Sequence, residues 1–505
     1  MDGGYLREVK SGARALSASA RASPVRASLL VGGLLALGIF LWHSVCGAFG
    51  CFSNSGDEGM EVNKALLVAS GHHLYAEIWN DQPPLYTLFL SALFDSGMVE
   101  MLWLRRANCI FTVFLFVATC AVGGMLGLSV AELLSAGGFL TTSFAFLPCS
   151  ASATLEIPAL SLGMLGTWGL LLAISRSSIV WGVVAGSLFG VAAMLKLTGL
   201  SVLPLAGGFV AVAWLARQPR CVCVSAAALF ASAVTAVVIW WSCTGGASWH
   251  YLVFTHFAGY PAVDAEASAA YRFRWTWFSS QPFFTVAAAI GGIYLALSSR
   301  KWTAALVGVW ATSILLAFAA HFPWWNYYSI HLSIPMALLA GVGLVGGIRW
   351  IISTRGGGAL QAGFKLLAAA LAAAGVWEWG EAFAAEAARV RAEGPWQDNP
   401  IVQCVRKHVP NAHGQRTMLQ LVPDPYAAYC RLQPLPWYAV MPLKRYWIGD
   451  LTDDELAEHI RAQKADVLIA PALDRARPTL VEAIRVSYQP LCGDEDIGVW
   501  VPRTQ

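Results

Sequence analysis

About eleven apolar runs, each of a length suited to crossing a membrane, constrain the fold more than any other feature of the sequence. The runs lie near 29–46, 107–126, 132–148, 157–175, 179–195, 197–216, 222–243, 281–298, 302–320, 329–348 and 362–379. A helix of about 20 residues crosses the ~30 Å hydrocarbon core of a bilayer. Because 57% of the 505 residues are hydrophobic and only 12% are charged, the chain favours a bilayer over water as its solvent. We therefore expect an all-α polytopic membrane protein.

Basic residues between the runs predict how the chain is oriented. With residues 1–27 as a basic cytoplasmic N-terminus, the cytoplasmic connections contain Arg176, Arg217, Arg220, Arg300, Lys301, Arg349, Arg355 and Lys365. The positive-inside rule favours this arrangement. It places loop 47–106, the connection 149–156, loop 244–280 and everything after about 380 on the other side. Run 29–46 also resembles the start of a signal peptide, but no convincing small-residue cleavage site follows it, so we expect a retained first span.

One apolar stretch is too short to be a span. Leu85–Leu93 follows Pro83 and Pro84, and proline is well suited to the start of a helix. We expect an amphipathic helix there that lies at the outer interface.

The pattern changes after residue 380 to short apolar runs separated by helical stretches. The runs are Thr417–Val422, Val467–Ile469 and Gly498–Val501. One helix is expected to start at Thr452, because Glu455 follows at the spacing of a capping box. The sequence therefore predicts a transmembrane domain over 28–380 and a small extracytoplasmic α/β domain over 381–505.

Cysteine usage and net charge restrict the class of protein further. Most of the 11 cysteines lie in or beside apolar runs, where cysteine behaves as a small hydrophobic residue. Cys404, Cys430 and Cys492 lie in the predicted outer domain, so one pair can be oxidised, and the sequence leaves open which. The net charge is only +3, and its basic residues form short clusters between apolar runs. Nucleic acid is therefore excluded as an expected partner.

The loop that follows the first run contains two neighbouring carboxylates. Asp57 and Glu58 occur in Ser53–Gly59, directly above the predicted membrane surface. A carboxylate there is placed to act as a general base on an acceptor hydroxyl. The alternative is a solvated turn, since aspartate, glycine and serine are typical turn residues.

A second motif, GHHLYAEIWNDQPPLY over Gly71–Tyr86, packs polar and aromatic residues before a double proline. Together with Asp57 and Glu58, it resembles the GT-C membrane glycosyltransferases, in the branch of the protein O-mannosyltransferases and lipid A aminoarabinose transferases. The resemblance covers about residues 28–350 and is densest over 50–110.

This resemblance implies the GT-C fold and an enzyme that moves a sugar, with inversion, from a polyprenyl phosphate to an extracytoplasmic acceptor. It implies that Asp57 is the base, that Glu58 and Asp81 assist it, and that Tyr75 and Gln82 contact substrate. The lipid A branch often has lysine immediately before Pro-Pro, where it contacts the phosphate. Here Gln82 takes that place, so a different cation must serve.

Three basic residues are candidates for that cation, because a fixed positive charge stabilises a leaving phosphate. Lys196 stands at the outer end of a run, where the alternative is a side chain that snorkels to the interface. Arg272 and Arg274 lie in loop 244–280, where the alternative is an ordinary solvated loop. Arg105 and Arg106 are expected to anchor the second span at the lipid headgroups.

Two further candidates stand at the outer ends of later spans. Glu156 is either functional or a favourable charge at a helix N-terminus. The stretch His321–His331 resembles a late outer loop of the same family, so Tyr327, Tyr328 and His331 are predicted to approach the donor. An interfacial aromatic belt is the alternative for the aromatic residues, but it explains His331 poorly. The histidines lack metal-ligand spacing, so neither a metal nor a cofactor is expected to be required.

The sequence therefore predicts a hexosyl- or pentosyltransferase with a polyprenyl-phosphate sugar donor. The expected location is a bacterial inner membrane, with the site and the C-terminal domain on the periplasmic side. The expected acceptor is a lipid, a glycan or a protein. Membrane lipids are expected to surround the protein. The alternatives are a transporter or flippase of lipid-linked sugars, which is expected to show inverted repeats or mid-membrane charges, and an inactive assembly subunit.

Overall fold

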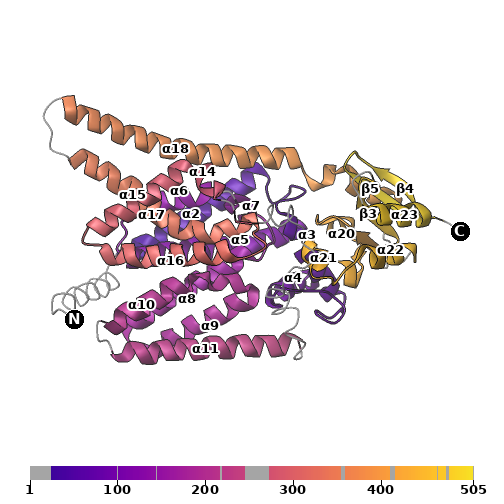
Figure 1. Ribbon diagram of the computed structural model, residues 1–505, viewed down its shortest axis with the longest axis horizontal. Coiled ribbons are helices and arrows are strands. Elements are labelled where there is room, and N and C mark those ends of the chain that lie inside the picture. Colours follow the sequence, from indigo (N-terminus) through magenta and orange to yellow (C-terminus); the bar gives the residue numbers. More distant parts are fainter. Residues whose placement is uncertain are drawn as a thin grey trace.

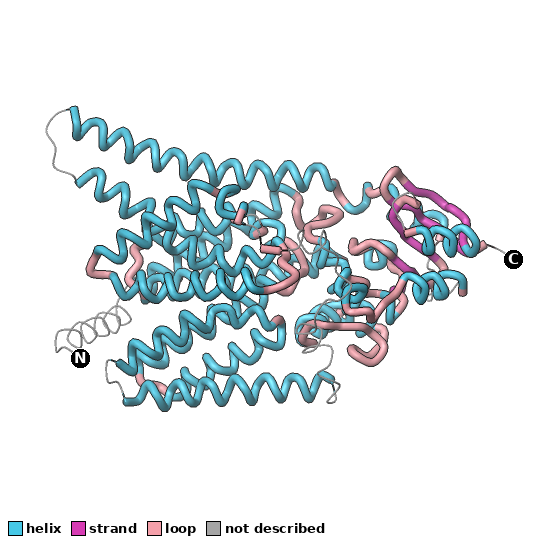
Figure 2. The backbone as a smooth tube through the Cα atoms, viewed as in Figure 1, coloured by secondary structure: helices cyan, strands magenta, loops and turns pink. Residues whose placement is uncertain are grey.

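The structure is a computed structural model that describes residues 24–503 apart from 99, 144, 216–218, 245–271, 274, 354–358, 410–415, 463–464 and 474–476. A long bundle of helices makes up most of the molecule, and a smaller domain lies at one end of it (Figure 1). Figure 2 shows the strands of the sheet gathered in this smaller domain.

Helices occupy the predicted spans. They are α2 (Pro24–Cys46), α5 (Met101–Met125), α6 (Val130–Thr142), α8 (Glu156–Arg176), α9 (Ile179–Leu195), η1 (Leu197–Val202) with α10 (Leu203–Leu215), α11 (Pro219–Thr244), α15 (Pro282–Leu297), α16 (Lys301–Ala320), α17 (Ser329–Ser353) and α18 (Ala359–Glu393). In the part of the chain that is described, seven helical segments are long and apolar enough to cross a membrane, and α9 and α15 are shorter apolar helices. The predicted polytopic helical fold is confirmed.

The predicted span 132–148 is wrong in its second half. Helix α6 ends at Thr142, and a separate short helix, α7 (Phe146–Ser150), follows. The hydroxyls of Thr141 and Thr142 donate to the carbonyls of Gly138 and Phe139 at 2.6 and 2.8 Å. The helical ladder ends because the backbone of Ser143 leaves the helical region, with φ −59° and ψ 128°.

Two helices that do not belong to the predicted spans precede α5. Helix α3 (Gly56–Ala69) carries the first-loop carboxylates, and α4 (Leu85–Asp95) begins directly after Pro84, as predicted. One face of α4, including Tyr86, Leu90 and Phe94, is buried. Both helices lie at the end of the bundle that faces the smaller domain (Figure 1).

Helices α15 and α17 cross at glycines. A Cβ atom on Gly291 would overlap the carbonyl of Leu339, and one on Gly343 would overlap the carbonyl of Ala287. Small residues at such crossings allow two helix backbones to approach closely, which is how helices associate where lipid replaces water. The chain therefore depends on backbone-to-backbone packing at this crossing.

The C-terminal domain is built around a five-stranded sheet with the order β2-β1-β3-β5-β4. Strand β1 is parallel to β2 and β3, whereas β5 is antiparallel to β3 and β4. Its strands are β1 (Thr417–Gln420), β2 (Gln433–Pro434), β3 (Val467–Pro471), β4 (Tyr488–Gly493) and β5 (Ile497–Pro502). Its helices are α19 (Pro400–His408), α20 (Tyr426–Cys430), α21 (Leu443–Trp447), α22 (Asp453–Arg461) and α23 (Pro478–Ser487). The expected α/β domain is confirmed.

Three details of this domain can be compared with the predictions: a helix cap, the cysteines and the domain boundary. Thr452 and Glu455 form the predicted capping box of α22. Cys404 and Cys492 form a disulfide bond, whereas Cys430 is buried and free. Helix α18 continues without a break through position 381 to Glu393, so the compact C-terminal fold begins after that helix.

Replacing Gly291 with alanine tests the glycine crossing. We expect Gly291→Ala to lower the free energy of unfolding by about 1–3 kcal/mol, because the added methyl group meets the backbone of α17. The measurement is a denaturation titration in detergent micelles. Gly292→Ala is the matched control, since a Cβ there meets no atom within 4 Å. Equal stability of the two variants would contradict the close crossing.

Candidate active site

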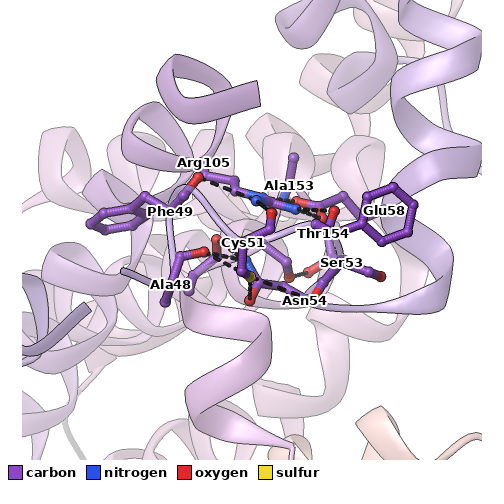
Figure 3. Close-up of polar contacts among 12 residues, drawn as sticks. Ala48, Phe49, Cys51, Ser53, Asn54, Glu58, Arg105, Ala153 and Thr154 are labelled. Atoms are coloured by element: carbon purple, nitrogen blue, oxygen red, sulfur yellow. Dashed lines mark hydrogen bonds and ion pairs between the residues drawn. The ribbon is translucent and has the colours of Figure 1, made fainter. Parts of the chain in front are cut away.

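A fully buried ion pair fixes the loop between α2 and α3. Arg105 of α5 donates to both carboxylate oxygens of Glu58, at 2.9 Å from Nε and 2.6 Å from Nη2. The same guanidinium donates to the carbonyls of Phe49, Cys51 and Phe52 (Figure 3). An arginine fork suits this role because it is planar and offers five donors.

This ion pair changes what the sequence predicted for Arg105 and for Glu58. Arg105 was expected at the lipid headgroups, but its side chain is fully buried, because the carboxylate of Glu58 and three loop carbonyls satisfy it away from water. Glu58 also accepts from the backbone amide of Ala153 at 2.7 Å. Its carboxylate therefore joins three segments of the chain and does not line the cavity described below.

Two further contacts tie the same loop to α18 and the C-terminal domain. Arg389 of α18 donates to the carbonyl of Ser53 at 3.0 Å and to the side-chain oxygen of Asn54 at 2.7 Å. The hydroxyl of Tyr429 donates to the carbonyl of Phe52 at 2.7 Å. The start of α3 is thus fixed from both sides, and Asp57 stands in its first turn.

A cavity of about 360 Å³ lies between the C-terminal domain and the end of the helix bundle that faces it. We call it the interdomain cavity. Its lining is Asp57, Met60, Glu61, Lys64, Asp81, Gln82, Leu155, Lys196, His321, Pro323, Trp325, Tyr327, Tyr328, Gln420, Leu421, Val422, Pro423, Ala439, Val440, Met441, Pro442, Leu443 and Lys444. Six of the predicted site residues therefore meet at one place: Asp57, Asp81, Gln82, Lys196, Tyr327 and Tyr328.

Every lysine that lines the cavity is paired with a carboxylate. Lys64 lies 2.7 Å from Glu61, and Lys444 lies 2.8 Å from Asp81. Lys196 forms a salt bridge with Glu156. All three lysine side chains are at most 8% exposed. A buried charge is tolerated when an opposite charge and hydrogen bonds compensate it, which these pairs provide.

Among the described residues, Asp57 is the cavity carboxylate that no salt bridge neutralises. Burial and the nearby Glu156 carboxylate raise the pKa of Asp57 to about 6, although Lys196 and a hydrogen bond from Tyr327 act in the opposite direction. A carboxylate with a pKa near neutrality is suited to accept a proton. The geometry therefore singles out Asp57 as the candidate general base.

Lys196 lies inside the protein and does not snorkel. Its ammonium lies 4.8 Å from the ring centre of Tyr327 and 5.5 Å from that of Tyr328. Glu156 is in the first turn of α8, so it is both the partner of Lys196 and a charge at a helix N-terminus. The two interpretations of Glu156 are therefore compatible.

Three predicted residues lie beside the cavity and not in its lining. Tyr75 donates its hydroxyl to the carbonyl of Gln82 at 2.6 Å, which shapes the loop. His331 is buried, and its Nδ1 lies 2.9 Å from the hydroxyl of Ser201, the polar partner that its position requires. Arg272 is exposed. Arg274 and most of loop 244–280 lie outside the described residues.

Sequence reasoning missed Glu61, Lys64 and Lys444. Asp57, Glu61 and Lys64 have the i, i+4, i+7 spacing of one helix face, so a helical reading of 56–69 would have joined them. Lys444 carries no such signal, because it comes from α21 of the C-terminal domain. Within the described ranges, no group of three or more His, Cys, Asp or Glu residues is placed to hold a metal ion.

Solved structures with a similar fold are membrane glycosyltransferases. ArnT from Cupriavidus metallidurans, bound to undecaprenyl phosphate, has a TM-score of 0.64 and 12% identity, over 92% of this chain and 97% of that one. The Archaeoglobus fulgidus oligosaccharyltransferase in the apo form has a TM-score of 0.52 and 11% identity, over 88% and 69%. No protein-family model and no curated protein sequence matches the chain. The chain therefore has the GT-C fold, as its motifs predict.

Replacing Glu58 with glutamine tests the buried ion pair. We expect Glu58→Gln to lower the free energy of unfolding by about 3–5 kcal/mol, because it leaves Arg105 buried without a counter-charge. The measurement is a denaturation titration in detergent. Glu100→Gln is the matched control in the same outer segment, because Glu100 is exposed and its change should cost less than about 0.5 kcal/mol. A small effect of Glu58→Gln would show that the pair is dispensable.

Proposed function

We propose that the protein is an inverting glycosyltransferase that moves a hexose or pentose from a polyprenyl phosphate to an acceptor hydroxyl. The observation that carries this proposal is Asp57, a partly buried carboxylate with a raised pKa that faces a cavity lined by three lysines. Its support is the GT-C fold shared with ArnT, which was solved with undecaprenyl phosphate bound.

The proposed reaction is a direct displacement at the anomeric carbon. Asp57 takes the proton from the acceptor hydroxyl, and the acceptor oxygen forms a bond to the anomeric carbon. The bond from that carbon to the phosphate oxygen breaks, and polyprenyl phosphate leaves with the electron pair. Inversion follows because attack and departure occur on opposite faces of the sugar.

Charge that develops on the leaving phosphate needs a fixed cation. Lys196 is held by Glu156 and lies against the rings of Tyr327 and Tyr328, so its ammonium needs no reorganisation during the reaction. Fixed charges of this kind act strongly where water is excluded. Gln82 lines the same cavity and supplies amide hydrogen-bonding groups without a charge.

The proposed location is a bacterial inner membrane, with the cavity facing the periplasm. The disulfide between Cys404 and Cys492 supports an outer location for the C-terminal domain, because disulfides persist in oxidising compartments. Basic residues near the opposite ends of the spans support the same orientation. The donor's isoprenoid tail would then lie along apolar helix surfaces within the bilayer.

Replacing Asp57 with asparagine tests the proposed base. Membranes that contain the native chain or Asp57→Asn receive radiolabelled polyprenyl phosphate sugars, with a native lipid and protein extract as acceptor. We expect Asp57→Asn to lower transfer at least about 100-fold, because asparagine cannot accept the proton. Asp95→Asn is the matched control, since Asp95 is exposed in the same outer segment and does not line the cavity.

The outcomes of this experiment are distinct. Transfer by the native chain and by Asp95→Asn, with loss in Asp57→Asn at equal expression, supports the enzyme and its base. Equal transfer by all three removes Asp57 from the mechanism. A native chain that transfers no sugar from any donor contradicts the proposed activity and favours a transporter or an assembly subunit.

The raised pKa of Asp57 predicts a pH dependence. A base works only when ionised, so kcat/KM should fall about tenfold per pH unit below pH 6 and level off above it. In Tyr327→Phe, the lost hydrogen bond no longer lowers this pKa, so the acid limb should move to higher pH. Initial rates across pH 4.5–8 measure both effects. An acid limb at the same pH in the two proteins would contradict the assignment.

A further inference from the structure

The C-terminal domain forms one wall of the interdomain cavity. Its segments 420–423 and 439–444 face residues of α3 and of the 321–328 loop across the cavity. Gly59 permits this close approach, because a Cβ atom there would overlap the backbone of Pro423 and Asp424. The domain is therefore seated directly against the turn of α3 that carries Asp57.

One charged side chain of the C-terminal domain lines the cavity, within the described residues. Lys444 stands in α21 (Leu443–Trp447), its side chain is 8% exposed, and its Nζ donates to Asp81 at 2.8 Å. Asp81 immediately precedes Gln82, whose side-chain nitrogen donates to the same carboxylate at 3.3 Å. The ammonium of Lys444 is thus held beside the uncharged Gln82.

Neighbouring contacts hold the segment that presents Lys444. The guanidinium of Arg445 is fully buried and donates to the carbonyls of Trp437 and Val440 at 2.7 and 3.0 Å. It also forms a salt bridge with Asp450 at 3.0 Å and stacks against Trp79 of the outer loop, 5.2 Å from the ring centre. Lys444 therefore belongs to a fixed structure and not to a flexible surface.

The three cavity lysines differ in exposure and in the groups that contact them. Lys64 donates to Glu61 at 2.7 Å and to Asn80 at 3.0 Å, so two of its three protons are used. Lys196 is held by Glu156 and two aromatic rings. Lys444 is the most exposed of the three, and it enters the cavity from the C-terminal domain. A second cation on that domain lets an anion be held from both domains.

We propose that Lys444 binds the phosphate of the substrate, so that the C-terminal domain completes the site. The inference rests on the proposed glycosyltransferase function, and it adds a ligand-binding residue from a separate domain. Asp81 then balances the charge of Lys444 until the phosphate binds. The ligand chemistry is a phosphate ester, carried by a lipid or free in solution.

Binding of undecaprenyl phosphate to the full-length protein in detergent tests this proposal without relying on catalysis. Tryptophan fluorescence gives the Kd, since Trp325 lines the cavity. We expect Lys444→Gln to raise the Kd at least about tenfold, as loss of a charge-assisted hydrogen bond does. Lys444→Arg should retain most of the affinity. Lys407→Gln, an exposed lysine of the same domain outside the cavity, should bind like the native chain.

The variant Asp81→Asn shows whether Lys444 binds phosphate or only holds the C-terminal domain against the helix bundle. If Lys444 binds phosphate, Asp81→Asn keeps the affinity for undecaprenyl phosphate whereas Lys444→Gln loses it. Equal losses in both variants would show that the ion pair only holds the domain and would overturn the proposal. Undecaprenol, which lacks the phosphate, should bind native chain and Lys444→Gln alike.

Two further comparisons identify the source of the phosphate and distinguish failure of this inference from failure of the proposed function. If millimolar inorganic phosphate competes with undecaprenyl phosphate, the site binds free phosphate. If it does not compete, the site binds the phosphate of the lipid. Native affinity in Lys444→Gln would overturn this inference while leaving sugar transfer intact. A native chain that binds neither undecaprenyl phosphate nor inorganic phosphate would overturn both this inference and the donor class.

Discussion

The buried ion pair between Glu58 and Arg105 is the interaction on which the geometry of the site depends. Charges without water are stable only when their partners are close and their hydrogen bonds are filled. Arg105 meets this condition by joining Glu58 to three loop carbonyls, and Glu58 by accepting from Ala153. The pair therefore joins the first loop, α5 and the approach to α8, which brings Asp57 near Glu156 and Lys196.

The charged side chains that line the interdomain cavity follow one pattern with one exception. Lys64, Lys196 and Lys444 each have a carboxylate partner, so most of the cavity's charge is balanced before any ligand arrives. Asp57 has a hydrogen bond from Tyr327 instead, and its pKa lies near 6. An unneutralised carboxylate in a partly buried site is less stable as an ion, and this is why we propose Asp57 as the base.

The C-terminal domain changes the environment in which this chemistry would occur. Its residues cover one side of the cavity, and reduced contact with water strengthens charge interactions. Contacts to the helix bundle come from Tyr429, Lys444 and the backbone beside Gly59. The domain is therefore part of the cavity wall, because removing it would open the cavity on one side.

Parts of this structure could be predicted from local sequence and parts could not. Apolar runs predict helices directly, and the Pro-Pro motif predicts the start of α4. The Asp57 motif predicts a carboxylate that the structure places in the lining of the cavity. The end of α6 at Thr142 falls inside a run that is apolar enough to read as one span, so the run alone does not reveal it. The burial of Arg105 depends on a partner 47 residues away, and the place of Lys444 on one 363 residues away. Contacts of that range are set by tertiary packing, which a single sequence does not reveal.

Photolabelling tests the central claim, that a lipid-linked sugar reacts in the interdomain cavity, most directly. The probe is a polyprenyl phosphate sugar with a photoreactive group on its first isoprene unit, and mass spectrometry locates the labelled peptides. The account predicts labels on α3, on residues 321–328 and on 439–444, with loss of labelling when unmodified undecaprenyl phosphate competes. Labels confined to the lipid-facing surface of α11 or α18, unaffected by competition, would contradict it.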